Sequence, residues 1–449
     1  MGKLGSKYIQ WVEKYLPSPF ILALLLSGVT FLMALVYQFS NKGLFQAGLD
    51  TATYWYSGFW ELLSFTMQMA MILLLGYIVA VSPVVKRLIN SIADQANNTA
   101  QAAAIVCFTT LIASFLNWGL CVIFGAILAR QLALRFQEKG KAINYGLLAA
   151  AGYSGMMAWH GGFSGSAPLK VAEANHFLVD KIGSIGISET LLSPMNIVVA
   201  LALLILLPLL AYWVGKASPG KRLKVEKENT HKEKDNLIEN VANGAESKPL
   251  ISKLLAVILL LVAITYAIQQ HQAGDNIIDL NFINFCLLSL GILLHKHLTS
   301  FFQAAQTGIS SVTDVLIQFP FYAGIMGIMK YSGLVLLMSD FFVSISNELT
   351  FPLFSFISAA VVNFFVPSGG GQWAVQGPIL IEAAKTLGIA PQKVIMALAY
   401  GDQITNMLQP FWALPLLGIT GLKAKDILPY TFLFFVLGLL IFTISLLVF

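Results

Sequence analysis

Long hydrophobic runs alternate with short polar stretches along this chain. The runs 19–39, 196–214 and 430–449 reach or approach the roughly 20 residues that an α-helix needs to cross a bilayer. Backbone groups in lipid must be hydrogen-bonded internally, so such runs predict helices. We therefore expect an all-α polytopic membrane protein with crossings at 19–38, 57–82, 143–176 (broken), 195–215, 253–270, 280–297, 308–333, 391–421 (broken) and 427–449.

Two further apolar segments, 99–136 and 351–388, each contain a polar tip, at Asn117 and Asn363. We take their arms as too short to cross a bilayer alone, and we expect each segment to form a re-entrant helical hairpin. In both halves of the chain a polar break follows the hairpin at nearly the same spacing, over 152–169 and 400–416. The shared order predicts two copies of one unit.

The predicted organisation is an interfacial N-terminal segment over 1–18, repeat 1 over 19–215 and repeat 2 over 280–449. A charged cytoplasmic linker over 216–250 and one extra span over 251–272 separate the repeats. Because the extra span has no counterpart, the second repeat starts from the opposite side of the membrane. The repeats are then inverted, and their hairpin tips point toward each other.

Composition excludes an ordinary soluble enzyme, because 57% of the residues are hydrophobic and 11% are charged. The net charge of +5 lies mainly in loops, so it bears on membrane orientation and gives no reason to expect a nucleic-acid partner. With the N-terminus and linker in the cytoplasm and the C-terminus outside, 21 of the 27 Lys and Arg residues lie on the cytoplasmic side. Lys170 is one of the six placed outside.

Non-helical backbone at membrane depth must be enclosed by protein or line a watery cavity, so the tips and breaks are the candidate site. Helix N-termini exposed there attract anions. No Lys or Arg occurs over 142–169, 351–384 or 394–422, which favours a single carboxylate held by dipoles and hydroxyls. The candidate substrate-binding residues are Ser368, Gly369, Gly370, Gly371, Ser164 and Ser166, with Gln372, Asn406 and Gln409 as second choices; Trp118, Phe364, Trp373, Phe411 and Trp412 are candidates for walling an apolar tail.

Ionisable groups inside the predicted spans are few. Asp402 is a candidate to bind a proton or a sodium ion, and His160 to carry a proton; for each, a purely structural role is the open alternative. The three cysteines lack metal-ligand spacing and are expected to be small buried hydrophobic residues. The segment 162–165 is similar to the serine motif of rhomboid intramembrane proteases, so an intramembrane serine hydrolase stays as a remote alternative to a transporter.

Three motifs carry a resemblance to a known family. VNFFVPSGGGQWAVQGPIL at 362–380, the NWG tip at 117–119 and WHGGFSGS at 159–166 are similar to the bacterial short-chain fatty acid transporter family of the ion-transporter superfamily. The likeness begins at KYLPSPF, residues 14–20, and covers nearly the whole chain.

The resemblance implies a non-enzymatic carrier without a cofactor in the bacterial inner (cytoplasmic) membrane. It implies cation-coupled uptake of short-chain monocarboxylates such as butyrate or acetoacetate, by an elevator-like movement within a homodimer. Relatives that use sodium bind it at the hairpin tips, which implies sodium near Asn117 and Asn363. A carrier of the same superfamily for dicarboxylates or amino acids is the alternative.

Overall fold

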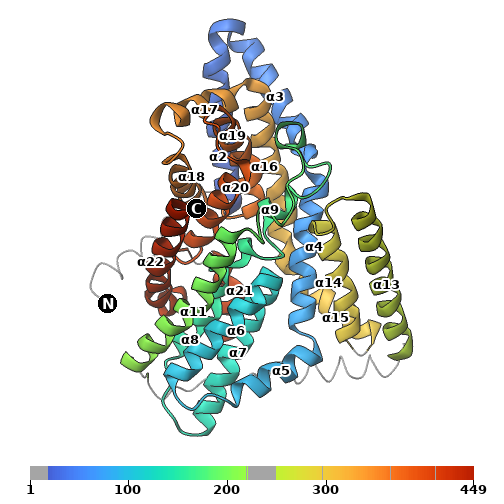
Figure 1. The fold of residues 1–449 in the computed structure, drawn as a ribbon, viewed down its shortest axis with the longest axis vertical. Helices are drawn as coiled ribbons and strands as arrows, with labels where there is room; N and C mark the ends of the chain where they lie inside the picture. The colour runs from blue at the N-terminus through green and yellow to red at the C-terminus, as the bar shows by residue number, and fades with distance from the viewer. Residues whose placement is uncertain (1–18, 219, 221–248, 296, 365, 410) are drawn as a thin grey trace.

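The computed structural model describes the chain except residues 1–18, 219, 221–248, 296, 365 and 410, so the predicted interfacial segment and nearly all of the linker lie outside the described residues. The described residues form α-helices and short 3-10 helices, with no strand among them (Figure 1). Seven of these helices are long and apolar enough to cross a membrane. The expectation of an all-α polytopic membrane protein is confirmed.

The helices form two groups that pack mainly within themselves. We call one the flanking bundle, which holds most of the right-hand side of Figure 1. It comprises α2 (Pro19–Lys42), α3 (Leu44–Glu61), α4 (Leu63–Ala80), α13 (Pro249–Ala273), α14 (Leu280–Leu294), α15 (Leu298–Gly308), η3 (Ile309–Val312) and α16 (Thr313–Ser332). Helix α17 (Leu334–Ile345) follows α16 and packs mainly on α19 (Gly369–Thr386) of the other group.

We call the other group the hairpin bundle, because it contains both predicted hairpins and both predicted breaks. Helix α5 (Pro83–Ala93) leads into it from α4 and packs on α7. The bundle comprises α6 (Thr99–Leu116), α7 (Trp118–Glu138), α8 (Tyr145–Tyr153), η1 (Ser154–Met157), η2 (Trp159–Gly161), α9 (Ser166–Lys170), α10 (Val179–Ile182), α11 (Pro194–Ala217), α18 (Phe351–Val362), α19 (Gly369–Thr386), α20 (Pro391–Thr405), η4 (Phe411–Ala413), α21 (Leu414–Thr420) and α22 (Ala424–Val448).

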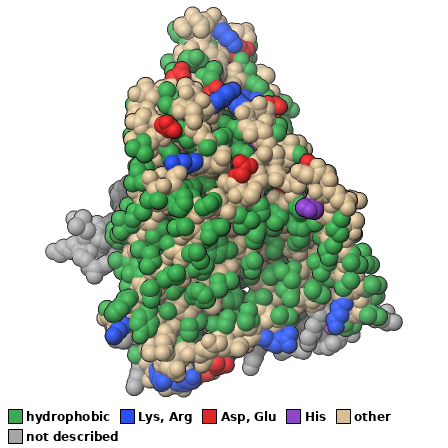
Figure 2. All heavy atoms as spheres, in the orientation of Figure 1, with side chains coloured by type: hydrophobic (Ala, Val, Ile, Leu, Met, Phe, Trp, Pro, Cys, Tyr) green, Lys and Arg blue, Asp and Glu red, His purple; other side chains and the backbone are tan. Residues whose placement is uncertain are grey.

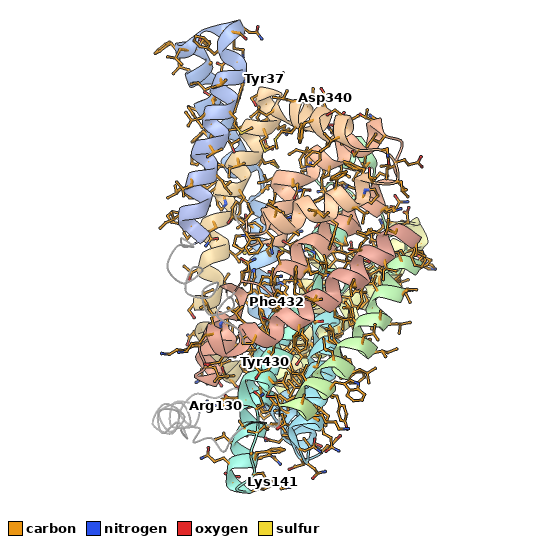
Figure 3. All side chains as sticks on the ribbon, turned by 90° about the vertical axis from the view of Figure 1, so that its left-hand side faces the viewer. Tyr37, Arg130, Lys141, Asp340, Tyr430 and Phe432 are labelled. Carbon is orange, nitrogen blue, oxygen red and sulfur yellow. The ribbon has the colours of Figure 1, made fainter. Side chains whose placement is uncertain are left out.

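Charged side chains gather at the two ends of the molecule. Figure 2 shows a broad band of hydrophobic side chains with Lys, Arg, Asp and Glu mainly above and below it. In Figure 3, Arg130 and Lys141 lie toward one end and Tyr37 and Asp340 toward the other. The band is what a bilayer-embedded surface requires, because lipid tails contact it directly.

The helix ends occur where the local sequence changes. Helix α8 ends at Tyr153, where the run Ser154–Met157 tightens into a 3-10 turn, and α20 ends at Thr405 before the polar segment 406–409. Asn117 separates α6 from α7 by one extended residue and its side chain caps α7, since its Oδ1 accepts a hydrogen bond from the Leu120 amide. Each predicted break therefore coincides with an interruption of the helix.

The arms of the first hairpin are longer than expected. Helices α6 and α7 have 18 and 21 residues, and each is long and apolar enough to cross a bilayer alone. The expectation of short arms is wrong for this hairpin. In the second hairpin, α18 has 12 residues and α19 has 18. The two inverted repeats and their boundaries stay a prediction.

Several helices lie where the sequence predicted loops or a longer span. Helix α3 occupies the region before α4, so the predicted span 57–82 begins inside a different helix. Helices α5, α15 and α17 were also not expected, and α17 turns by 81° from α16. Helix α3 packs closely on α16, because Gly58 lies against Gly327: a Cβ atom at Gly58 would be 2.5 Å from the Gly327 Cα atom.

Candidate functional site

The two tips and the two breaks meet in the structure. Tip and break of each half are joined by hydrogen bonds: the Trp118 amide donates to the Ser164 Oγ atom at 2.9 Å, and the Asn363 Nδ2 atom donates to the Asp402 carbonyl at 2.7 Å. The breaks of opposite halves are joined as well, because His160 Nε2 lies 2.7 Å from Asp402 Oδ2. Residues some 240 positions apart in sequence thus form one polar centre.

A small cavity, which we call the central cavity, lies at this meeting point, with a volume of about 20 Å³. That volume holds about one water molecule, so a larger ligand requires its walls to move. It lies between the two bundles, since Met69, Val315 and Phe319 come from the flanking bundle and the remaining walls from the hairpin bundle. Those walls are Trp118, Met156, Trp159, Ser166, Ser368, Gly369, Gly370 and Trp412.

Four of the predicted substrate-binding residues line the central cavity: Ser166, Ser368, Gly369 and Gly370. The three-glycine run forms the first turn of α19, and the Ser368 Oγ atom accepts a hydrogen bond from the Gly371 amide at 3.3 Å. This puts the amide end of an 18-residue helix at the cavity wall. Such an end carries partial positive charge and binds anions.

The other predicted substrate-binding residues do not line the central cavity. Ser164 accepts the hydrogen bond from the first tip, and Gln372 donates to the Ala359 carbonyl at 2.9 Å. Trp373 is fully buried away from the cavity, beside Phe177. Asn406 and Gln409 hydrogen-bond with the second tip, at 3.2 Å each, and Gly371 packs against Tyr322.

Aromatic side chains separate the central cavity from two larger ones. Trp118 and Trp412 form an edge-to-face pair, with ring centroids 4.9 Å apart, and they also line a mainly apolar cavity of about 440 Å³. On another side, Phe319 contacts Phe65, which contacts Phe177. Phe177 lines a cavity of about 460 Å³ that also contains charged side chains from α3, α10, α16 and α19.

The pair formed by His160 and Asp402 is fully enclosed, with 0% and 1% of the side chains exposed. Within the described residues, His160 Nδ1 and Asp402 Oδ1 have no hydrogen-bond partner. Gly369 lies directly over the pair, since a Cβ atom there would be 2.2 Å from His160 Nε2. A proton or a metal cation near this pair would therefore act close to the wall of the central cavity.

The two tip asparagines have different surroundings. The Asn117 Nδ2 atom donates to the Ile72 carbonyl of α4 at 2.9 Å and its Oδ1 atom caps α7, so both amide atoms are used. The Asn363 Nδ2 atom donates within the second break, but Asn363 Oδ1 has no partner among the described residues, and neither has Gln409 Oε1. Sodium prefers oxygen ligands, so the unpartnered oxygens of the second tip fit such an ion.

A charged cluster beside the site was missed at the sequence level. Lys170 was counted as an outside residue, yet it is the one Lys or Arg that is buried among the described residues. Its Nζ atom pairs with Glu173 and donates to Gln68 Oε1 at 3.2 Å. The stretch without Lys or Arg ends at Leu169, one residue before Lys170. Lys170 and Glu173 lie three residues apart within a predicted span, and this spacing was the signal in the sequence for a buried ion pair.

Comparison with solved structures gives the fold. The chain is similar to MtrF of Neisseria gonorrhoeae, described as illuminating a class of antimetabolite efflux pumps, with a TM-score of 0.59 and 15% identity over 98% of this chain and 97% of that one. It is equally similar to the YdaH transporter of Alcanivorax borkumensis, with a TM-score of 0.59 and 14% identity over 96% and 98%. At these identities the likeness shows the fold alone, which this chain shares with those two transport proteins.

Sequence comparison then gives the family. The model of the short chain fatty acid transporter family matches residues 1–449. A protein of Escherichia coli K12, provisionally named a short-chain fatty acid transporter, is 36% identical over the full length of both chains. A protein of Haemophilus influenzae with the same provisional name is 38% identical over 94% of this chain and 93% of its own. The chain belongs to the short-chain fatty acid transporter family, and it is a transporter and not an enzyme.

Proposed function

We propose that this chain is a secondary active transporter that carries short-chain monocarboxylates, such as butyrate or acetoacetate, across the bacterial cytoplasmic membrane. The observation that carries the proposal is the central cavity, where the amide end of α19 and two serine hydroxyls face aromatic side chains. The polar wall suits one carboxylate. The apolar wall, which includes Trp118 and Trp412, suits a short hydrocarbon tail.

The size of the central cavity supports alternating access. Trp118 and Trp412 line both this cavity and the apolar one. The Phe65 ring contacts Phe319 of its wall and Phe177 of the charged cavity. In our proposal the substrate enters from one larger cavity and leaves by the other, and the two aromatic closures never open together. The hairpin bundle moves against the flanking bundle, in the manner of an elevator, because the central cavity lies between them.

We further propose that a cation is carried with each substrate. Asp402 and His160 can share a proton at 2.7 Å, and the unpartnered Asn363 and Gln409 oxygens beside them can contribute to a sodium site. Either cation would offset the charge of a carboxylate bound next to Gly369. A homodimer with a cytoplasmic N-terminus and linker and an outside C-terminus completes the proposal.

Uptake into proteoliposomes tests this function. We expect radiolabelled butyrate to accumulate under a sodium gradient alone or a proton gradient alone, whichever ion is coupled. Excess unlabelled butyrate or acetoacetate should block this uptake, and succinate should not. If succinate or an amino acid is accumulated and butyrate does not compete with it, the substrate class is wrong.

A further inference from the structure

The buried cluster around Lys170 lies outside the predicted site but next to it. We propose that Lys170 binds the carboxylate of the substrate during the transport cycle, with Glu173 as its resident counter-ion and the Phe65 ring as a removable cover. The inference rests on the proposed function, and it adds a specificity-determining cation to a site that the sequence predicted to have none.

One contact of the Lys170 ammonium group, that with the Phe65 ring, can be replaced by a substrate carboxylate. It carries three N–H donors. The described residues provide two acceptors, Glu173 Oε2 and Gln68 Oε1. Another side of the ammonium group is covered by the Phe65 ring, whose centroid lies 5.1 Å from the Nζ atom. A carboxylate is a stronger partner for an ammonium group than a phenyl ring, so a substrate that displaces the ring satisfies the third donor.

The cluster adjoins the central cavity through three residues, Ser166, Met69 and Phe65. Ser166, which lines the cavity, lies one helical turn before Lys170 in α9, and its Oγ atom donates to the Met69 Sδ atom at 3.3 Å. Met69 also lines the cavity and follows Gln68 in α4. The Phe65 ring itself packs against the cavity wall, because a Cβ atom at Gly370 would be 3.0 Å from Phe65 Cζ. A lysine side chain is long enough to turn toward a neighbouring cavity once that ring moves.

Glu173, the counter-ion of Lys170, is also held by a hydrogen bond that does not involve Lys170. Gln68 Nε2 donates to Glu173 Oε1 at 2.8 Å and to Asn281 Oδ1 at 2.9 Å. Glu173 therefore keeps a donor while Lys170 turns toward a substrate. Glu173 and Asp279, which caps α14 nearby, outnumber the single cation. A carboxylate bound here needs an additional cation, which agrees with the proposed coupling.

A purely structural ion pair is the rival interpretation, and a charge-neutral double variant separates the two. Buried ion pairs are often replaced by neutral residues of similar size without loss of stability. The test variant is Lys170→Met with Glu173→Gln. The matched control is Lys42→Met with Asp50→Asn, an ion pair at 2.7 Å between α2 and α3 within the flanking bundle. Both purified proteins are examined for fold by thermal unfolding and size-exclusion chromatography.

The measurement compares butyrate with its uncharged analogue butyramide as inhibitors of labelled butyrate binding. In the wild type and in the control pair we expect butyrate to bind at least about tenfold better than butyramide, because an ionised partner makes the stronger hydrogen bond. In the Lys170 and Glu173 double variant we expect the affinity for butyrate to fall at least about tenfold. The ratio of butyrate affinity to butyramide affinity should then approach one. A folded double variant that keeps the wild-type preference overturns the inference. Wild-type protein that binds no butyrate overturns the proposed function instead.

If the double variant does not fold, a second variant tests whether Lys170 binds the substrate carboxylate. Phe65→Leu keeps the ion pair and removes the aromatic cover from Lys170. Since the cation–π contact no longer opposes the exchange, we expect the KM for butyrate to fall about two- to fivefold, with butyramide inhibition unchanged. A KM for butyrate that is unchanged or higher overturns the inference.

Discussion

The two hairpin tips each contain an asparagine, but the two asparagines make different hydrogen bonds. Asn117 is fully hydrogen-bonded: it caps α7 and holds α4 through the Ile72 carbonyl. Gly76 of α4 lies so close that a Cβ atom there would be 2.0 Å from Asn117 Oδ1. The Asn363 Nδ2 atom instead lies within hydrogen-bond distance of three acceptors of the second break, which share its two N–H donors, and its oxygen has no partner among the described residues. The first tip thus joins the two bundles, and the second tip has a buried acceptor oxygen without a partner among the described residues.

The difference extends to the neighbouring polar groups. Around the second tip and the His160–Asp402 pair, several buried polar atoms of the described residues have no hydrogen-bond partner; they are Asn363 Oδ1, Gln372 Oε1, Asp402 Oδ1, Asn406 Nδ2, Gln409 Oε1 and His160 Nδ1. An unpaired buried polar group is costly, so a cluster of them points to a missing partner. We infer that cation binding is concentrated at the second tip.

The largest expected effect comes from Asp402→Asn. Asparagine keeps the size of the side chain and removes its charge, so the His160 pair loses its capacity to hold a proton or a cation. Gradient-driven butyrate uptake in proteoliposomes should fall to background. Asp50→Asn, which removes a carboxylate from α3 of the flanking bundle, is the control and should keep uptake. Full uptake by the Asp402 variant would remove this residue from the coupling mechanism.

Next in size is Gly369→Ala, which tests how closely the second tip approaches the first break. The added methyl group would lie 2.2 Å from His160 Nε2 and 2.8 Å from Trp159 Cη2, so one of them must shift. We expect uptake to fall at least about tenfold, since overpacking costs about 1–3 kcal/mol and displaces the His160–Asp402 pair. Gly28→Ala in α2 has no atom within 4 Å of its added methyl and should transport normally. Equal uptake by the two variants would contradict this packing.

The paired variants Asn117→Ala and Asn363→Ala test whether the two tips have different roles. Loss of the Asn117 cap and of its bond to Ile72 should destabilise the protein by about 2–3 kcal/mol, which thermal unfolding would detect. Loss of Asn363 should change stability less, and should raise the cation concentration needed for half-maximal uptake at least about fivefold. If both variants shift the cation dependence equally, the two tips have the same role.

The smallest expected effect is that of Ser368→Ala. It removes the α19 cap, worth about 1 kcal/mol, and one hydroxyl from the cavity wall. We expect a three- to tenfold higher KM for butyrate with the maximal rate nearly unchanged, measured by initial uptake rates. Ser445→Ala, at a buried serine of α22 distant in sequence from the tips, should leave the KM as it is. A normal KM for the Ser368 variant would argue that the carboxylate binds elsewhere.

The sequence was most informative where polar residues interrupt apolar runs. The glycines and serines after Tyr153 and the polar segment after Thr405 indicated the helix interruptions, and the Gly369 run indicated the amide end of α19. These features are local, because glycine, serine and asparagine change the backbone within one helical turn.

The missed features depend on tertiary contacts. Helix α3 buries Ala47, Thr51 and Gly58, small residues that allow close helix packing but give little hydropathy signal. The pairing of Lys170 with Gln68 joins residues 102 positions apart, so no local pattern contains it. The same holds for the different surroundings of Asn117 and Asn363, which have the same local pattern of an asparagine after an apolar helix.

Binding of butyrate in the central cavity is tested most directly by cryo-electron microscopy. The map would be of the full chain in lipid nanodiscs with saturating butyrate and the coupling cation. We expect density for a small molecule between Ser166, Ser368 and the Gly369 amide, inside a central cavity enlarged beyond its present volume of about 20 Å³. Butyrate density located away from both hairpin tips would contradict it.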